Sequence, residues 1–389
     1  LAGVHAEQLA ARGELGMAIA AYRALTAQDP GHIQAQRRLL DLRAQAGQQR
    51  QALAEARTRR RRRPGDALAW YLEGLALTYV GPPAHFHQAR AAIERALALD
   101  AQNPFAHQTL GWLHEQRHLR RGDKEQLQRA AAAYETASGL LRTGTWPRAA
   151  ADLELNLGNV LFALGHHRRA EQHYRRRWQS EVGFRLPQRR LVFLERFGRS
   201  ALLSGELAAA EHAFAAATAQ ARELKRRDRV PRLIAARAAA QQLSGDYDRA
   251  AQLFERACGW YAEQGRRRAL ARCWRNAAHC HFQRGAGVAA LDALRRARTL
   301  LAERPRADAD AAAERLVSVP LGPGASRAAQ GFDRRGELNV IHTLESRLFA
   351  RAGDRPRAIA ALRRRIELLR ADARAGQAAA RLELAVARN

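Results

Sequence analysis

Residues 155–174 read LNLGNVLFALGHHRRAEQHY and contain the pattern that decides the fold. Gly158 is followed by Gly165 after seven residues, by Ala170 after five more and by Tyr174 after another four. A small residue lets two helices approach closely, and a glycine just past a helical segment ends it and opens a turn. Residues four apart share one helix face, so Ala170 and Tyr174 are expected to bury against the preceding helix. The stretch therefore predicts a helical hairpin.

The same pattern returns every 40 residues. Four columns of residues keep this step: Gly165, Gly205, Gly245 and Gly285; Ala170, Ala210, Ala250 and Ala290; Tyr174, Phe214, Phe254 and Leu294; Gly158, Gly198, Ala238 and Ala278. Four columns with one period are the signature of a repeat array. Less regularly spaced copies of the pattern continue outward, around Gly13, Gly47, Gly74, Gly111 and Gly353.

The quoted stretch resembles a tetratricopeptide (TPR) repeat, and the 40-residue units resemble the longer TPR variants. The residues on that family's signature positions are Leu157, Gly158, Leu161, Gly165, Ala170 and Tyr174. The resemblance implies an all-α fold, a right-handed α-solenoid of about nine helix-turn-helix hairpins. In such an array each hairpin buries its apolar face only against its neighbours.

The repeats divide the chain into six segments. We expect repeats 1–2 in residues 1–64, repeats 3–4 with insertions in 65–145, repeats 5–8 in 146–302, an irregular insertion in 303–336, repeat 9 in 337–371 and a capping helix in 372–389. The insertion is predicted because Pro320, Gly322, Pro323 and Gly324 forbid regular structure. A loop of this length is either a passive or disordered bulge or a lid or docking element. Leu1 falls inside a first helix, so we expect the array to extend upstream, and a removed signal peptide or anchor is left open.

The chain is strongly basic. It has 66 Lys plus Arg against 38 Asp plus Glu, a formal charge of +28, and its lysines are Lys124 and Lys225. A GC-rich genome explains arginine in place of lysine but does not explain the excess over acid, which attracts nucleic acid, acidic lipid or acidic protein. The densest run, Arg59–Arg63 before Pro64, is either a solvated helix end that suits the helix dipole or a docking patch.

Two motifs invite a metal or catalytic interpretation. His114-Glu115-Gln116-Arg117-His118 matches the HExxH spacing of zinc peptidases, but no third ligand is evident beyond Glu135 and His114 takes a packing position of its hairpin. Cys273, His279, Cys280 and His281 gather on one expected helix, without metal-binding spacing. We interpret both groups as packing residues, with Cys258 and its two fellow cysteines as small buried thiols.

No sequence motif for a cofactor or a catalytic nucleophile is present. The chain contains no P-loop, dinucleotide-binding glycine motif or G-x-S-x-G elbow. It also has no apolar run of 18 residues, so no transmembrane span is expected. We therefore expect no cofactor, no metal and no enzymatic activity in this segment.

The TPR resemblance also implies a partner-binding groove lined by the first helix of each hairpin. The positions that match the family's groove carry basic and amide side chains: Asn156, Asn159, Arg196, Arg199, Arg232, Arg272, Arg275, Asn276, His279, Arg347 and Arg351. Asn156 and Asn159 followed by Arg196 and Arg199 loosely resemble the family's carboxylate clamp, in which arginine can grip a carboxylate bidentately. The alternative is that both asparagines are simply common at those repeat positions. We expect charge reversal at Arg199 and Arg275 to abolish binding while the fold survives.

Three functions remain open at this stage. The first is a scaffold or adaptor that binds an acidic peptide or protein in the basic groove. The second is a nucleic-acid or polyanion binder, favoured by the +28 charge but without regularly spaced aromatics for base stacking. The third is a non-catalytic segment of a larger enzyme or regulator. Compartment and oligomeric state are not set by the sequence, although three free-looking cysteines favour a reducing cytoplasm.

Overall fold

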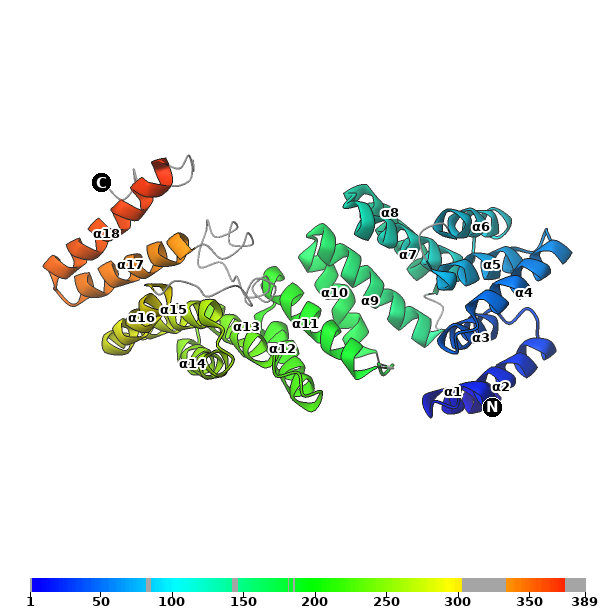
Figure 1. Ribbon diagram of the computed structural model, residues 1–389, viewed down its shortest axis with the longest axis horizontal. Helices are drawn as coiled ribbons and strands as arrows, with labels where there is room; N and C mark the ends of the chain where they lie inside the picture. The colour runs from blue at the N-terminus through cyan, green and yellow to red at the C-terminus, as the bar shows by residue number, and fades with distance from the viewer. Residues whose placement is uncertain are drawn as a thin grey trace. The chain divides into compact units, whose positions relative to one another are not determined.

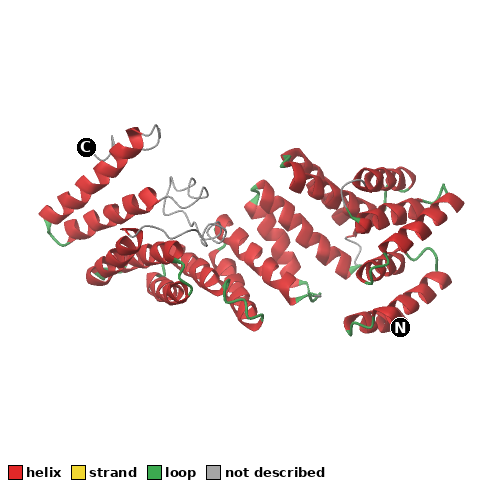
Figure 2. Ribbon diagram, viewed as in Figure 1, coloured by secondary structure: helices red, strands yellow, loops and turns green. Residues whose placement is uncertain are grey.

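The computed structural model describes residues 2–81, 85–141, 146–180, 182–184, 186–302 and 334–374. Regular structure in these residues consists of 18 α-helices without a strand (Figures 1 and 2). Successive helices pair as nine hairpins, from α1–α2 to α17–α18. The prediction of an all-α array of about nine hairpins is confirmed.

The chain divides into two compact units, Leu1–Val182 and Gly183–Asn389. The first unit contains α1 (Ala2–Ala11), α2 (Leu15–Gln28), α3 (Ile33–Gln45), α4 (Gln49–Arg62), α5 (Ala67–Val80), α6 (His85–Leu99), α7 (Pro104–Arg121), α8 (Lys124–Leu141), α9 (Pro147–Leu164) and α10 (His167–Gln179). The second contains α11 (Pro187–Ser204), α12 (Leu207–Glu223), α13 (Val230–Leu243), α14 (Tyr247–Glu263), α15 (Arg267–Gln283), α16 (Gly287–Ala302), α17 (Arg334–Arg351) and α18 (Arg355–Arg374). None of these helices offers an apolar stretch long enough to cross a bilayer.

The glycines of the 40-residue period end the first helix of each hairpin, as the sequence predicts. Gly165 and Gly205 are the C-caps of α9 and α11 and have φ values of +86° and +85°. Gly245 and Gly285 have φ values of +86° and +80° directly after α13 and α15 have ended. A side chain is disfavoured in this left-handed region, and glycine occupies it without steric cost.

A second set of glycines lies where the two helices of a hairpin touch. A Cβ on Gly158 of α9 would lie 2.6 Å from the Tyr174 ring of α10, and one on Gly198 of α11 would lie 2.8 Å from Phe214 of α12. The Tyr174 hydroxyl donates a hydrogen bond of 2.9 Å to Oδ1 of Asn159, which fixes the ring above Gly158. The predicted close approach of the two helices is therefore present.

The apolar core runs along each unit instead of collecting at one centre. The alanines of the second column, Ala170, Ala210, Ala250 and Ala290, are all fully buried. Within each unit, a second helix packs on its own first helix and on the first helix of the next hairpin, as α12 does with α11 and α13. Alanine at these contacts keeps helices close and explains how an alanine-rich chain forms a solenoid.

Parts of the predicted segmentation lie outside the described residues. These are residues 303–333 of the expected insertion and residues 375–389 of the expected capping helix. The last three residues of the expected insertion, 334–336, form the first turn of α17. The repeat boundaries stay a prediction.

Candidate functional site

In the second unit, two pairs of successive first helices contact each other directly. Helix α11 contacts α13, and α15 contacts α17, while α12, α14 and α16 pack between successive first helices on the other side. We call the surface presented by α11, α13, α15 and α17 the first-helix face. It is the surface on which the sequence places most of the candidate binding residues.

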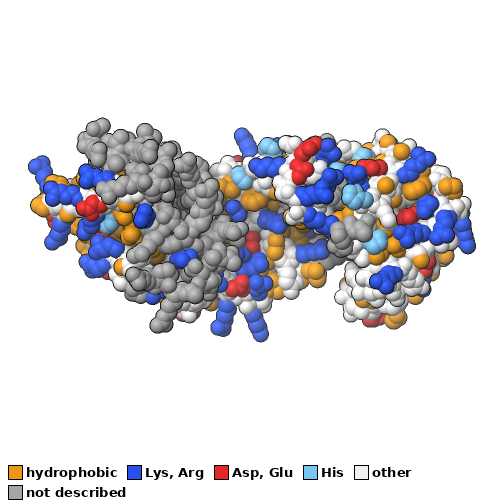
Figure 3. Space-filling model, turned by 45° about the horizontal axis from the view of Figure 1, so that its top comes forward, with side chains coloured by type: hydrophobic (Ala, Val, Ile, Leu, Met, Phe, Trp, Pro, Cys, Tyr) orange, Lys and Arg blue, Asp and Glu red, His pale blue; other side chains and the backbone are white. Residues whose placement is uncertain are grey.

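Charge is divided unequally between the two layers of helices. Helices α11, α13 and α15 contain ten arginines and one acidic residue, Glu195. Helices α12, α14 and α16 contain six arginines and six acidic residues. Because the second layer is balanced, the positive charge of these three hairpins is concentrated on their first helices, although basic side chains are also visible elsewhere on the molecule (Figure 3).

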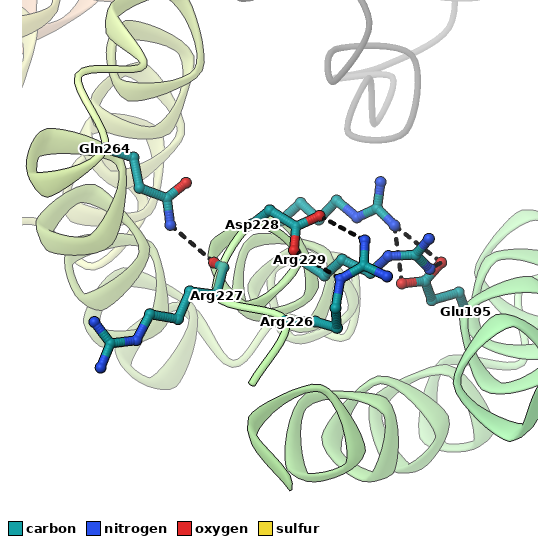
Figure 4. A network of polar contacts seen from close by, with 7 residues as sticks. Glu195, Arg226, Arg227, Asp228, Arg229 and Gln264 are labelled. Carbon is teal, nitrogen blue, oxygen red and sulfur yellow. Dashed lines mark hydrogen bonds and ion pairs between the residues drawn. The ribbon is translucent and has the colours of Figure 1, made fainter. Parts of the chain in front are cut away.

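Glu195 of α11 is shared by two arginines from the start of the next first helix. Arg229 Nη1 donates to its carboxylate at 3.0 Å, and Arg232 Nη2 donates at 2.9 Å. Figure 4 shows Glu195 facing Arg229, while Arg226 pairs with Asp228 in the adjoining loop. One carboxylate between two guanidiniums leaves a net positive charge, so the predicted residue Arg232 is held in place without the site being neutralised.

The loop before α13 carries further basic residues. Lys225 has a φ of +54°, in the left-handed region that glycine occupies in the turns of the 40-residue period. Gln264 Nε2 donates to the carbonyl of Arg227 at 2.8 Å, and the Arg227 side chain points away from the Glu195 network (Figure 4). This loop therefore presents exposed positive charge at the edge of the first-helix face.

A second shared glutamate lies between α15 and α17. Glu337 accepts from Arg272 Nε at 3.2 Å and from Arg275 Nη1 at 2.6 Å. Arg275 Nη2 also donates to Oδ1 of Asn276 at 2.8 Å. All four side chains are buried, and burial lowers the pKa of Arg275 although Glu337 opposes that shift.

This burial changes what three candidate residues can do. Arg272, Arg275 and Asn276 were placed in the groove by repeat position, but a partner would have to displace Glu337 to reach them. The expectation that the fold survives Arg275→Glu does not suit this geometry, because the new carboxylate would face Glu337 in a buried site. A binding test on this face requires exposed arginines instead.

The exposed candidates are Arg196, Arg347 and Arg351. Arg351 also lies over the Phe282 ring at 4.4 Å, and its Nη1 donates to the Phe282 carbonyl at 3.4 Å. Arg199 is half-buried, and burial lowers its pKa. Arg196 and Arg347 are therefore the candidates of this face that combine exposure with a free charge: among the described residues they form no ion pair.

The pKa of the His279 imidazole depends on positive charges of the first-helix face. Its pKa is lowered from the ordinary 6.5, first by burial and then by the positive charges of Arg275 and Arg347. The imidazole lies on α15, and Arg347 lies on α17. His279, Arg275 and Arg347 are thus close enough to interact electrostatically, and their shared role in one binding groove stays a prediction.

The two asparagine candidates lie on α9, in the first unit. Both are half-buried, and the side-chain Oδ1 of Asn159 accepts a hydrogen bond from the Tyr174 hydroxyl. Asn159 therefore serves the packing of its own hairpin. Arg196 and Arg199 belong to the second unit, and the carboxylate clamp with the two asparagines stays a prediction.

The side chains of the HExxH match are engaged in contacts within their own hairpin. His114 Nδ1 lies 2.9 Å from Oε1 of Gln126, His118 Nδ1 lies 2.8 Å from the Asp123 carbonyl oxygen, and Glu115 accepts the Tyr134 hydroxyl at 3.2 Å. Within the described ranges, no group of three or more His, Cys, Asp or Glu side chains is arranged to hold a metal ion.

The three cysteines are buried free thiols on α14 and α15. The Cys273 thiol donates to the Phe254 carbonyl at 3.1 Å, and burial raises the pKa of Cys280 to about 12. A buried neutral thiol is a poor metal ligand and a poor nucleophile.

Repeat-position reasoning missed Glu195, Glu337 and Arg229. The two glutamates determine which arginines are held in ion pairs within the fold. They are 34 to 65 residues away from these arginines in the sequence. A usable signal is the scarcity of acid on the first helices, because a lone glutamate among many arginines is expected to be paired.

Comparison with known proteins gives similarity in fold. No protein-family model and no curated protein sequence matches this chain. Similar solved structures include RapI in its apo form (12% identity over 87% of this chain and 97% of that chain, TM-score 0.45). Another is YrrB, a TPR protein with an unusual peptide-binding site (21% identity over 54% and 92%, TM-score 0.41). A third is the APC/C complex Cut9–Hcn1 (16% identity over 77% and 52%, TM-score 0.41).

YrrB is described as a TPR protein. This chain is a TPR-like helical repeat protein in fold, as its own nine helical hairpins and their 40-residue period show. The chain spans about half the length of the Cut9–Hcn1 chain that it matches. At such low identity, the similarity extends to architecture and not to partners.

Proposed function

We propose that this chain is a protein-interaction scaffold whose first-helix face in the second unit binds an acidic segment of a partner protein. The observation that carries this proposal is the ten-to-one ratio of arginine to acid on α11, α13 and α15, against the balanced second layer. An arginine excess spread uniformly over the chain would give both layers of these hairpins the same ratio of arginine to acid.

The recognition chemistry follows from the guanidinium group. Arginine stays charged, is more weakly hydrated than lysine and can bind a carboxylate with two parallel hydrogen bonds. An exposed ion pair contributes only about 0–1 kcal/mol, so affinity requires several carboxylates engaged at once. Arg196 and Arg347 supply contacts to such a ligand, and the charges of Arg275 and Arg347 add to burial in lowering the pKa of His279.

The test is a binding titration with a defined probe. A short fluorescein-labelled peptide of alternating glutamate and glycine is added to the full chain, and fluorescence anisotropy gives Kd. We expect Arg196→Glu with Arg347→Glu to weaken binding by about 30- to 100-fold. The matched control is Arg222→Glu with Arg256→Glu, which reverses two exposed arginines of α12 and α14. It should change Kd by less than about threefold.

Equal losses in both variants would contradict the proposal, because the net charge and not the face would then control binding. The competing nucleic-acid function is tested in the same assay. A single-stranded oligonucleotide that binds far more tightly than the peptide, with a steep fall of affinity in salt, would favour that function instead.

A further inference from the structure

A second basic surface lies in the first unit, outside the first-helix face. The structure contains a shallow pocket of about 710 Å³ between helix α4 and the turn before α3. It is lined by Pro30, Gln51, Ala54, Glu55, Thr58, Arg59, Arg62 and Arg63. We call it the α4 trough.

The lining residues of α4 form one continuous stripe. Their spacing of three and four residues keeps them on a single helix face. From Gln51 to Arg62 the stripe extends for about 16 Å at 1.5 Å per residue, which matches about five residues of extended peptide at 3.3 Å each. The trough therefore has the length and the open form of a site for a short extended peptide.

The arginines near the end of α4 differ in whether they pair with an acidic side chain. Arg57 and Arg60 pair with Glu73 at 3.5 and 2.6 Å, and Arg60 also lies 4.9 Å from the centre of the Trp70 ring. Within the described part of the chain, Arg62 and Arg63 form no ion pair and are exposed. Arg57 and Arg60 therefore share one carboxylate away from the trough, whereas Arg62 and Arg63, which line it, keep their full charge.

Arg59 forms the fixed wall of the basic end. Its Nη2 donates to the Pro30 carbonyl at 3.0 Å and lies 3.6 Å from Asp66. These contacts hold the guanidinium between α4 and the Pro30 turn. A fixed cation costs less side-chain entropy on binding than a fully mobile one.

Glu55 is the acidic residue that lines the α4 trough, and nearby arginines offset its negative charge. It accepts two hydrogen bonds from the buried Arg43, and Arg23 of α2 also lies near enough to contribute. Both arginines lower the pKa of Glu55, with the Arg43 hydrogen bond as the largest cause. The trough is consequently positive at the Arg59 end and close to neutral in its middle.

We propose that an extended acidic peptide segment of a partner protein binds along α4 in this trough, with its carboxylates at Arg59, Arg62 and Arg63. A continuous phosphate backbone would meet Glu55, whereas a peptide can place a neutral residue there and its acids beyond it. None of the lining residues is aromatic, so single-stranded bases would have no stacking partner. This site is independent of the first-helix face.

The test localises binding by photo-crosslinking. A photo-crosslinking amino acid replaces Gln51 in the full chain, and a biotinylated peptide of glutamate and glycine is the probe. Arg62→Glu with Arg63→Glu should reduce crosslinking at this position about tenfold. The matched control is Arg120→Glu with Arg121→Glu, two exposed adjacent arginines that end α7 in the same unit. The control should reduce crosslinking by less than about twofold.

Several outcomes would overturn the proposal. They are equal losses in both variants, absence of crosslinking, and displacement of the peptide by an oligonucleotide of equal charge at a much lower concentration. If circular dichroism shows that the Glu variant is misfolded, the neutral variant Arg62→Gln with Arg63→Gln must still lower crosslinking. Reversal of Arg196 and Arg347 should leave crosslinking at Gln51 unchanged, which separates this site from the proposed function of the second unit.

Discussion

In the first three hairpins of the second unit, the two layers of helices belong to the same hairpins but carry different charge. Helices α11, α13 and α15 have ten arginines and one acid, and helices α12, α14 and α16 have six of each. Both layers bury alanine and aromatic residues against each other, so packing does not require the difference. Genome composition explains why the basic residue is arginine, but it does not sort acids onto one layer.

Within the first layer, the arginines also differ among themselves. Arg272 and Arg275 are buried on Glu337, while Arg196 and Arg347 are exposed. In the second layer, local pairs such as Arg296 with Asp292 at 2.9 Å lie on the surface. The comparison teaches that repeat position alone does not distinguish a structural arginine from a binding arginine. Burial and the nearest acid make that distinction.

The largest expected effect is on the buried pair. Glu337→Ala leaves Arg272 and Arg275 buried without a carboxylate, and breaking a buried pair in this way costs about 3–5 kcal/mol. Hydrogen exchange of α15 and α17 amides measures the loss as local unfolding. Glu263→Ala, an exposed acid on α14, should stay within about 0.5 kcal/mol. Similar exchange in both variants would mean that Glu337 does not hold the two helices together.

A smaller effect is expected where the layers touch. Gly158→Ala places a Cβ 2.6 Å from a Tyr174 ring that Asn159 holds in position, so overpacking should cost about 1–3 kcal/mol. Gly139→Ala, within α8 and with no atom inside 4 Å of the added Cβ, should instead stabilise the helix by about 0.5–1 kcal/mol. Thermal unfolding followed by circular dichroism checks both signs. A stabilised Gly158→Ala variant would show that the contact is looser than the structure indicates.

The smallest expected effect is on the pKa of His279, and it compares the charges of the two layers. Burial and the charges of Arg275 and Arg347 lower the pKa of His279, so Arg347→Ala should raise that pKa toward the ordinary 6.5. Titration of the His279 imidazole by NMR measures the shift. Arg256→Ala on α14 removes one charge from the other layer and should leave the pKa unchanged. A shift of the same size in both variants would remove His279 as a reporter of the first-helix face.

Local chemistry explains how much of the fold could be predicted. Gly165, Gly205, Gly245 and Gly285 end helices because a left-handed turn favours glycine wherever it occurs, and their period reveals the hairpins. The contact of Gly158 with Tyr174 follows from the same spacing. These features depend on neighbours inside one hairpin, and the sequence displays them directly.

The binding residues were only partly predictable, because their environment comes from other hairpins. The repeat pattern places Arg275 and Arg347 on first helices, but it does not show that Glu337 reaches Arg275 from 62 residues away. In the same way, the run Arg59–Arg63 permits two interpretations until the Pro30 turn is seen to close one side of a trough. Longer-range contacts decide which charges remain free.

The most direct test of the account measures arginine accessibility in both layers at once. The full chain is treated with phenylglyoxal, with and without the glutamate–glycine peptide, and modified arginines are quantified by mass spectrometry. The account predicts that the peptide protects Arg196 and Arg347 while Arg222 and Arg256 keep their reactivity. Equal protection of all four, or protection of Arg222 and Arg256 alone, would contradict the claim that the first-helix face is the binding surface.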